Sequence, residues 1–138
     1  MENRKIYITE NDKIKLKGLF NTTIGFRDRD LKTIKDLLYE IERAEIINDG
    51  ESADNVIMMN SSVIVKDLDT KKEYTYTLVY PEFANSSENK ISILAPIGTA
   101  LLGYKAGDII EWQVPAGKRR LKVKKILTQP KLVVKNIA

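Results

Sequence analysis

The first part of the chain carries its apolar residues at helical spacing. Leu16, Leu19 and Phe20 fall on one face of a helix, and Thr9 stands where an N-cap is expected. The polar and glycine-containing stretch 21–25 then interrupts the pattern. The sequence therefore predicts a short first helix that begins after Thr9 and ends before residue 21.

A second, more regular helix is predicted to begin near Asp28 or Asp30, either of which is able to cap it. Its apolar residues repeat at spacings of three, four and three, which is typical of a coiled-coil seam. The seam residues are Leu31, Ile34, Leu38 and Ile41, and Leu37 and Ala44 widen this face. Two amphipathic helices around a short break predict an antiparallel helical hairpin. The alternative is two ordinary helices packed on a globular core.

Beyond residue 55 the apolar pattern changes from helical to alternating, which is typical of β-strands. The predicted strands cover 62–66, 73–79, 90–94, 109–114 and 119–127. Pro96 opens a short helix between two of these strands, and Gly103 closes it. The second part of the chain is therefore predicted to be an antiparallel β-domain with one short helix.

The polar stretch 48–52 separates these two patterns. We therefore predict an α+β fold in two units, a short N-terminal antiparallel helical hairpin over 1–50 and a β-domain over 51–138. Proteolysis is expected to cut first at 48–52 or in the hairpin, because a polar break has little buried backbone.

The composition excludes several classes of function. The 138 residues include no cysteine and no histidine, so disulfides, thiolate metal sites and Ser-His or Cys-His catalysis are ruled out. We expect a binding protein rather than an enzyme, without a cofactor. No apolar run approaches the length of a membrane span, and the N-terminus is polar, which predicts a cytoplasmic protein without membrane contact.

Positive charge gathers toward the end of the chain. The net charge is +4, and residues 118–138 hold eight Lys or Arg and no acidic residue. Such a stripe is able to attract an anionic partner, including nucleic acid. Its candidate residues are Arg119, Arg120, Lys122, Lys124 and Lys125. The alternative is a solvated strand face followed by a basic tail.

Asp28 and Asp30 are the carboxylates that stand at the predicted hairpin tip. Paired acids at an exposed tip are able to hold Mg²⁺ in the active site of another macromolecule. The alternative is that they only begin the helix and favour its dipole, with Arg27 and Arg29 reducing any acidic field.

The β-domain sequence resembles the C-terminal half of the Gre-factor family, most closely its Rnk branch, the regulators of nucleoside diphosphate kinase. The strongest block is ISILAPIGTALLG at 91–103, and AGDIIEW at 106–112 follows it. Two further segments, VIMMNSSV at 56–63 and TLVYP at 77–81, favour the Rnk branch. The resemblance covers about two-thirds of the chain.

This resemblance implies an FKBP-like β-domain that docks near the secondary channel of bacterial RNA polymerase. The matching docking positions are Leu94, Ala95, Pro96 and Ile97. Gre factors carry a long coiled coil whose acidic tip, in an Asp-Leu-Ser-Glu-Asn context, helps the polymerase cleave backtracked RNA. This sequence has no such motif and a shorter hairpin, so Asp28 and Asp30 are not assigned as cleavage residues.

Several functions remain open from the sequence. The preferred one is a monomeric transcription regulator that binds RNA polymerase and competes with Gre factors without stimulating cleavage. The runner-up is a Gre-type elongation factor that promotes cleavage of backtracked RNA. A peptidyl-prolyl isomerase rests on fold analogy alone, and direct nucleic-acid binding rests on the basic stripe.

Overall fold

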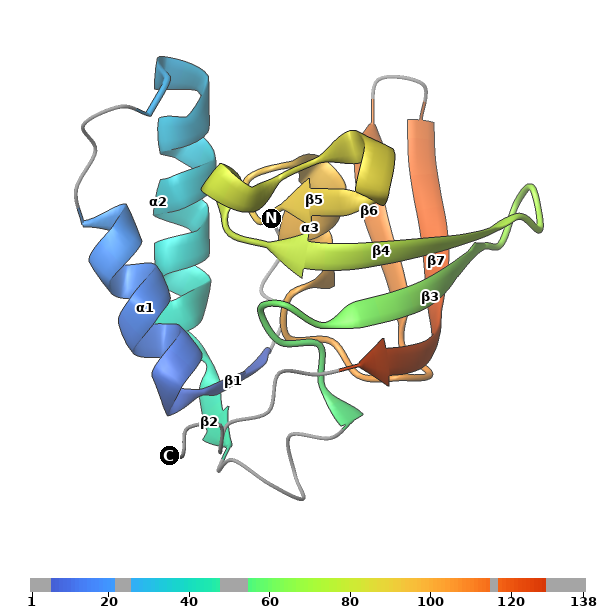
Figure 1. The fold of residues 1–138 in the computed structure, drawn as a ribbon, viewed down its shortest axis with the longest axis horizontal. Helices are drawn as coiled ribbons and strands as arrows, with labels where there is room; N and C mark the ends of the chain where they lie inside the picture. Colours follow the sequence, from blue (N-terminus) through green and yellow to red (C-terminus); the bar gives the residue numbers. More distant parts are fainter. Residues whose placement is uncertain (1–5, 22–25, 48–54, 115–116, 129–138) are drawn as a thin grey trace.

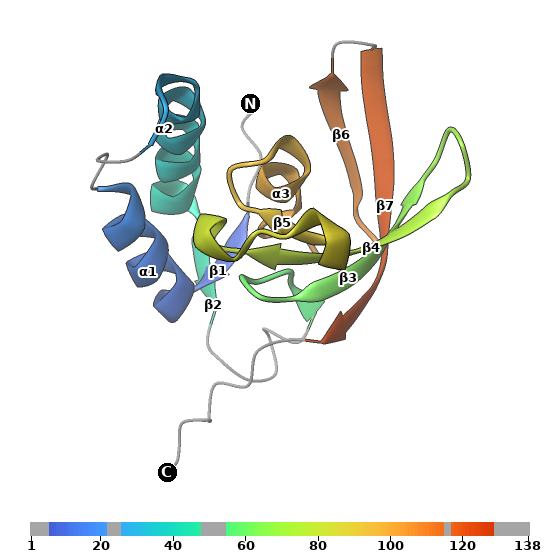
Figure 2. The same ribbon diagram turned by 45° about the horizontal axis from the view of Figure 1, so that its top comes forward.

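The structure is a computed structural model that describes residues 6–21, 26–47, 55–114 and 117–128. Helices α1 and α2 lie on one side of the molecule and most of the β-sheet on the other, with α3 between them (Figures 1 and 2). The elements follow in the order β1 (Tyr7–Thr9), α1 (Glu10–Phe20), α2 (Asp28–Arg43), β2 (Glu45–Ile47), β3 (Ser62–Asp67), β4 (Glu73–Val79), η2 (Pro81–Phe83), η3 (Ser86–Glu88), β5 (Lys90–Ser92), α3 (Pro96–Leu101), β6 (Ile109–Val114) and β7 (Gly117–Thr128).

Helix α1 begins where the sequence predicts it. The Thr9 side chain accepts a hydrogen bond of 3.2 Å from the backbone N–H of Asp12, which satisfies a donor that the first helical turn leaves free. The helix buries Leu16 and Phe20, while Leu19 is half-buried. The predicted cap and the apolar face of α1 are therefore confirmed.

The start of α2 differs from the prediction. Arg27 is the N-cap residue and makes no side-chain capping hydrogen bond, while Asp28 and Asp30 lie inside the first turn. Neither aspartate caps the helix, because both are past the extended residue that a cap requires. They still place negative charge at the positive end of the helix dipole.

The buried face of α2 matches the predicted face except at Leu31. Leu37 and Ile41 are fully buried and Ile34 nearly so, whereas Leu31 is 38% exposed. Residues of α2 share one hydrophobic cluster with residues of α1 and of the β-domain. Figure 1 shows α1 and α2 running in opposite directions, and an ion pair between Lys17 and Glu42 joins them.

The structure contains two short strands that the sequence does not predict. β1 and β2 flank the two helices and pair in parallel, with Ile8 opposite Ile46. Each strand has only three residues, too few for alternation to identify it. The backbone N–H of Tyr7 also donates to the carbonyl of Gly103, 3.3 Å away, so β1 is fixed to the segment that follows α3.

The main sheet has five strands in the order β5-β4-β3-β7-β6. The pairs β3–β4, β3–β7 and β6–β7 are antiparallel as predicted, but β5 pairs with β4 in parallel. The prediction of an antiparallel β-domain is therefore wrong at β5. The connection through η2 and η3 is long enough to carry the chain back before β5 starts, which a two-residue hairpin would not allow.

A bulge in β7 decides which of its side chains face the core. Val63 and Val65 of β3 are buried, and they stand opposite Ile126 and Val123 of β7. Two residues of β7 therefore correspond to the single residue Ile64 on β3, which is the arrangement of a β-bulge.

One hydrophobic cluster includes residues from both parts of the chain. It contains Leu16 and Leu37 of the helices together with Met59, Val65 and Leu101 of the β-domain. The predicted boundary at 48–52 lies outside the described residues, and the division at residue 50 stays a prediction. None of the described helices is long and apolar enough to cross a membrane.

Candidate functional site

The loop between β5 and α3 contains the four positions that the sequence analysis assigned to partner docking. The Ser92 side chain accepts a hydrogen bond of 2.9 Å from the N–H of Leu94, and the Ser92 carbonyl accepts one of 3.0 Å from Ala95. The Thr99 hydroxyl then donates to the Ile93 carbonyl at 2.6 Å. These bonds hold the loop at both ends.

Gly98 brings α3 unusually close to β5. A Cβ at this position would lie 2.0 Å from the Ser92 carbonyl oxygen, so no side chain is accommodated. The absence of a side chain therefore lets the helix pack directly on the end of the strand. Pro96 adds to this rigidity because its ring fixes φ at the first helical position.

The four loop residues are only partly exposed. Pro96 is exposed, whereas Leu94, Ala95 and Ile97 are half-buried. Leu94 and Ile97 also pack against the hydrophobic cluster. The loop thus presents a small apolar surface centred on Pro96. The residues on either side of Pro96 pack against the core.

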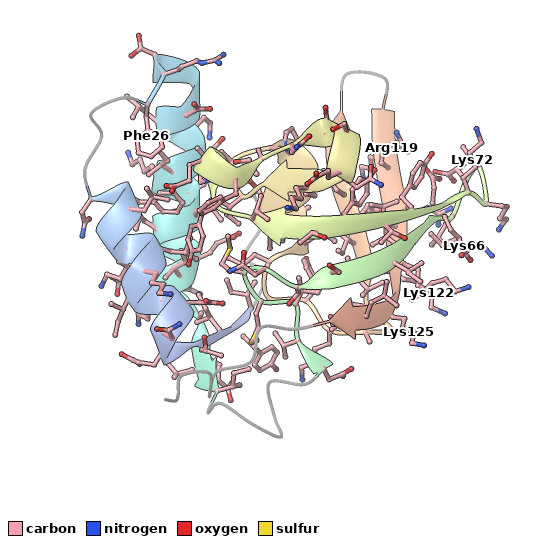
Figure 3. The ribbon with its side chains drawn as sticks, viewed as in Figure 1. Phe26, Lys66, Lys72, Arg119, Lys122 and Lys125 are labelled. Carbon is pink, nitrogen blue, oxygen red and sulfur yellow. The ribbon has the colours of Figure 1, made fainter. Side chains whose placement is uncertain are left out.

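The two tip aspartates lie on a different element. Asp28 is exposed and Asp30 is half-buried in the first turn of α2, where the exposed Arg27 precedes them. No group of three or more His, Cys, Asp or Glu able to hold a metal ion occurs among the described residues. The side chain of Phe26, labelled in Figure 3, is half-buried and packs against the hydrophobic cluster next to this turn.

The basic residues of β7 fall into two groups. Arg119 and Arg120 pair with Asp67 and Asp69, the latter at 3.1 Å. Lys124 pairs with Glu73 at 2.7 Å. Lys122 and Lys125 form no ion pair with any described residue. The five candidates are thus not equivalent, since the structure engages three of them in ion pairs.

The Asp67 carboxylate organises the end of the β3–β4 hairpin. It is fully buried and accepts hydrogen bonds from the N–H groups of Asp69 at 2.8 Å and Thr70 at 3.1 Å. The Thr70 bond, followed by the hydrogen bond from Arg119, lowers the pKa of Asp67 below its ordinary value. Arg119 therefore has a structural partner and is not free for a ligand.

Lys66 is a basic residue that the sequence analysis missed. It stands directly opposite Lys122 in the β3–β7 register, and Figure 3 shows Lys66, Lys122 and Lys125 on the same side of the molecule, away from α1 and α2. Lys66 is not recognised from the sequence because it lies outside the basic stretch 118–138. The signal available in the sequence was its alternation with the core residues Val65 and Asp67 on either side.

Comparison with known proteins places the chain in a family. A family model described as "Transcription elongation factor, GreA/GreB, C-term" matches residues 52–128. A solved structure of a prokaryotic transcription elongation factor GreA/GreB from Nitrosomonas europaea is 37% identical, with a TM-score of 0.73, and the match covers 91% of this chain and 99% of that one.

Curated relatives agree with this match. The regulator of nucleoside diphosphate kinase of Escherichia coli (strain K12) is 38% identical over 78 residues, which is 56% of this chain and 57% of that relative. Transcription elongation factor GreA of Thermotoga petrophila is 30% identical over 122 residues, 88% of this chain and 74% of that protein. The resemblance seen in the sequence is confirmed, and the chain belongs to the GreA/GreB family of transcription elongation factors.

Proposed function

We propose that this protein is a transcription regulator that binds bacterial RNA polymerase near its secondary channel and competes there with Gre factors without stimulating transcript cleavage. The observation that carries the proposal is the family match over residues 52–128, which includes the whole loop from β5 to α3. We also propose that the β-domain is FKBP-like, as in the family that the sequence resembles.

The loop Leu94–Ile97 suits a docking role. Pro96 is exposed, and the hydrogen bonds from Leu94 and Thr99 hold the backbone in place before any partner arrives. A preformed apolar contact loses little conformational entropy on binding, so more of the contact energy is retained as affinity. Buried apolar anchors also tend to contribute a large share of interface energy.

The helical part favours binding without cleavage. Helix α2 has 16 residues, so it extends about 24 Å at 1.5 Å per residue. The Gre arm implied by the resemblance is much longer and carries an acidic motif that this sequence lacks. The exposed Arg27 beside Asp28 also reduces the negative field at this end of α2.

Competition for the polymerase tests the docking part. Pro96→Asp places a charge in the contact, yet an acidic residue at the start of a helix is well tolerated, so the variant is expected to fold. Typical anchor energies predict a loss of about 2 kcal/mol, or roughly thirtyfold in affinity, in displacement of a labelled Gre factor. Leu127→Asp is the matched control, because Leu127 is also exposed but lies at the end of β7.

A cleavage assay tests the second part. Stalled, backtracked polymerase with Mg²⁺ is expected to cut its RNA no faster when this protein is added. Strong stimulation that disappears in the Asp28→Asn, Asp30→Asn double variant would establish the alternative, a Gre-type cleavage-promoting factor. Equal displacement of the Gre factor by wild type and a folded Pro96→Asp variant would exclude the Leu94–Ile97 loop as the docking element.

A further inference from the structure

Three lysines of the main sheet share one outward surface and form no ion pair with any residue that the structure describes. Lys66 of β3 stands opposite Lys122 of β7, and Lys125 stands opposite Ile64. We call Lys66, Lys122 and Lys125 the basic face; Figure 3 shows them projecting from the same side of the sheet.

The bulge in β7 adds Lys125 to this surface. In a regular strand Lys125 would point to the same side as Val123, which is fully buried. The extra residue opposite Ile64 lets Ile126 take the next inward position, so both Lys124 and Lys125 are exposed. The tertiary pairing of β7 therefore adds a lysine to the outer surface that strict alternation would have turned inward.

The neighbouring acids are already occupied. Glu73 lies beside Lys66 in the β3–β4 register, but its carboxylate is hydrogen-bonded to Lys124 at 2.7 Å. That bond is the main reason why the pKa of Glu73 is lowered, and Lys66 adds a weaker through-space effect. Asp69 is similarly bonded to Arg120. The basic face therefore keeps most of its positive charge.

The Lys66–Lys122 pair works against stability, although Glu73 on the other side of Lys66 partly offsets it. Like charges directly opposite one another on neighbouring strands are unfavourable, and Lys66 and Lys122 occupy such a pair. The fold has no need of a lysine at either position, since both point away from the core. An unfavourable pair that the fold does not require is more simply explained by an anionic ligand.

We propose that the basic face binds the phosphodiester backbone of nucleic acid without reading its sequence. A backbone that repeats its charge at regular intervals is able to meet all three lysines at once and to release counterions from each contact. Lysine contacts to phosphate oxygens carry no sequence information, so this recognition does not depend on the bases. This inference goes beyond polymerase docking, because α3 and its loop pack on the core side of the sheet.

Salt-dependent binding tests this proposal. The probe is a labelled mixed-sequence single strand of about 20 nucleotides, followed by fluorescence anisotropy at several KCl concentrations. Three lysine contacts predict a slope of log affinity against log salt of about −2, or roughly twentyfold weaker binding between about 50 and 200 mM KCl. The Lys66→Gln, Lys122→Gln, Lys125→Gln triple variant is expected to lose most of this slope.

A second triple variant controls for net charge. Lys15→Gln, Lys32→Gln, Lys35→Gln removes the same three charges from exposed positions of α1 and α2, and it should bind like wild type. The basic-face variant should melt at about the same temperature as wild type, because the relieved repulsion between Lys66 and Lys122 offsets the lost attraction between Lys66 and Glu73. A folded basic-face variant that binds the strand like wild type would overturn the proposal.

The remaining outcomes are also decisive. Equal losses in both triple variants would mean that only net charge matters, which excludes a specific basic face. Binding of poly-L-glutamate as tight as binding of the nucleic acid would assign the surface to an acidic protein partner instead. Absence of wild-type binding at about 50 mM KCl would exclude the proposal outright, and none of these results bears on competition with Gre factors.

Discussion

Replacing Gly98 by alanine measures how tightly α3 is held against β5. The new Cβ would lie 2.0 Å from the Ser92 carbonyl oxygen and 2.9 Å from its carbon, whereas ordinary contacts begin near 3.4 Å. Both atoms belong to the backbone, so no side-chain rotation is able to relieve the contact. The helix must move outward, and the 2.6 Å hydrogen bond from Thr99 to the Ile93 carbonyl must stretch.

The expected cost follows from three contributions. Overpacking of a well-packed site costs about 1–3 kcal/mol. Loss of the Thr99 hydrogen bond adds about 1 kcal/mol to the destabilisation. The better helix propensity of alanine offsets about 1 kcal/mol of it. The net destabilisation is about 2 kcal/mol, which is roughly thirtyfold in the folding equilibrium constant and about 8 °C in melting temperature for a chain of this size.

Urea denaturation and thermal melting of purified Gly98→Ala protein measure this cost. Gly18→Ala is the matched control, because Gly18 lies inside α1 and an added Cβ there meets nothing within 4 Å. That control should gain about 0.5–1 kcal/mol from the lower flexibility of its unfolded chain. Should Gly98→Ala match wild type in stability, the close packing of α3 on Ser92 would be refuted.

Three further substitutions give separate results. Gly103→Ala should destabilise the fold by about 2–4 kcal/mol in urea denaturation, because Gly103 has φ +85° and an added Cβ would lie 2.4 Å from Cβ of Ile6. Gly107 also has positive φ, but an added Cβ there meets open space, so Gly107→Ala should lower the free energy of unfolding by only about 1 kcal/mol. Asp67 has a lowered pKa in the folded state, so its stabilising effect is complete above the ordinary value of 3.8 and is lost as the pH falls below it. Asp67→Asn should therefore flatten the acid side of the stability-pH profile, and an unchanged profile would contradict the assigned hydrogen bonds.

Local sequence signals determined several elements of this protein. Thr9 identifies the start of α1, and alternation identifies β3, β4 and β6 nearly to the residue. Pro96 marks the start of α3 because its fixed φ suits the first helical position. These signals work because capping, alternation and proline geometry depend on residues only a few positions apart.

The candidate sites were predicted less completely. The loop Leu94–Ile97 was identified through family resemblance, but its half-buried state and the contact of Gly98 with Ser92 appear only when β5 and α3 pack together. Asp28 and Asp30 were expected to cap α2, and only the backbone conformation of Arg27 shows that neither does.

Tertiary structure alone decided the remaining features. The parallel pairing of β5 with β4 depends on how the chain returns through η2 and η3, and β1 and β2 are too short to recognise without each other. Lys66 joins Lys122 across 55 intervening residues only because β3 pairs with β7 in this register. Sequence patterns report local conformation and which side of an element is apolar, whereas register, bulges and strand direction are set by long-range packing that leaves no local trace.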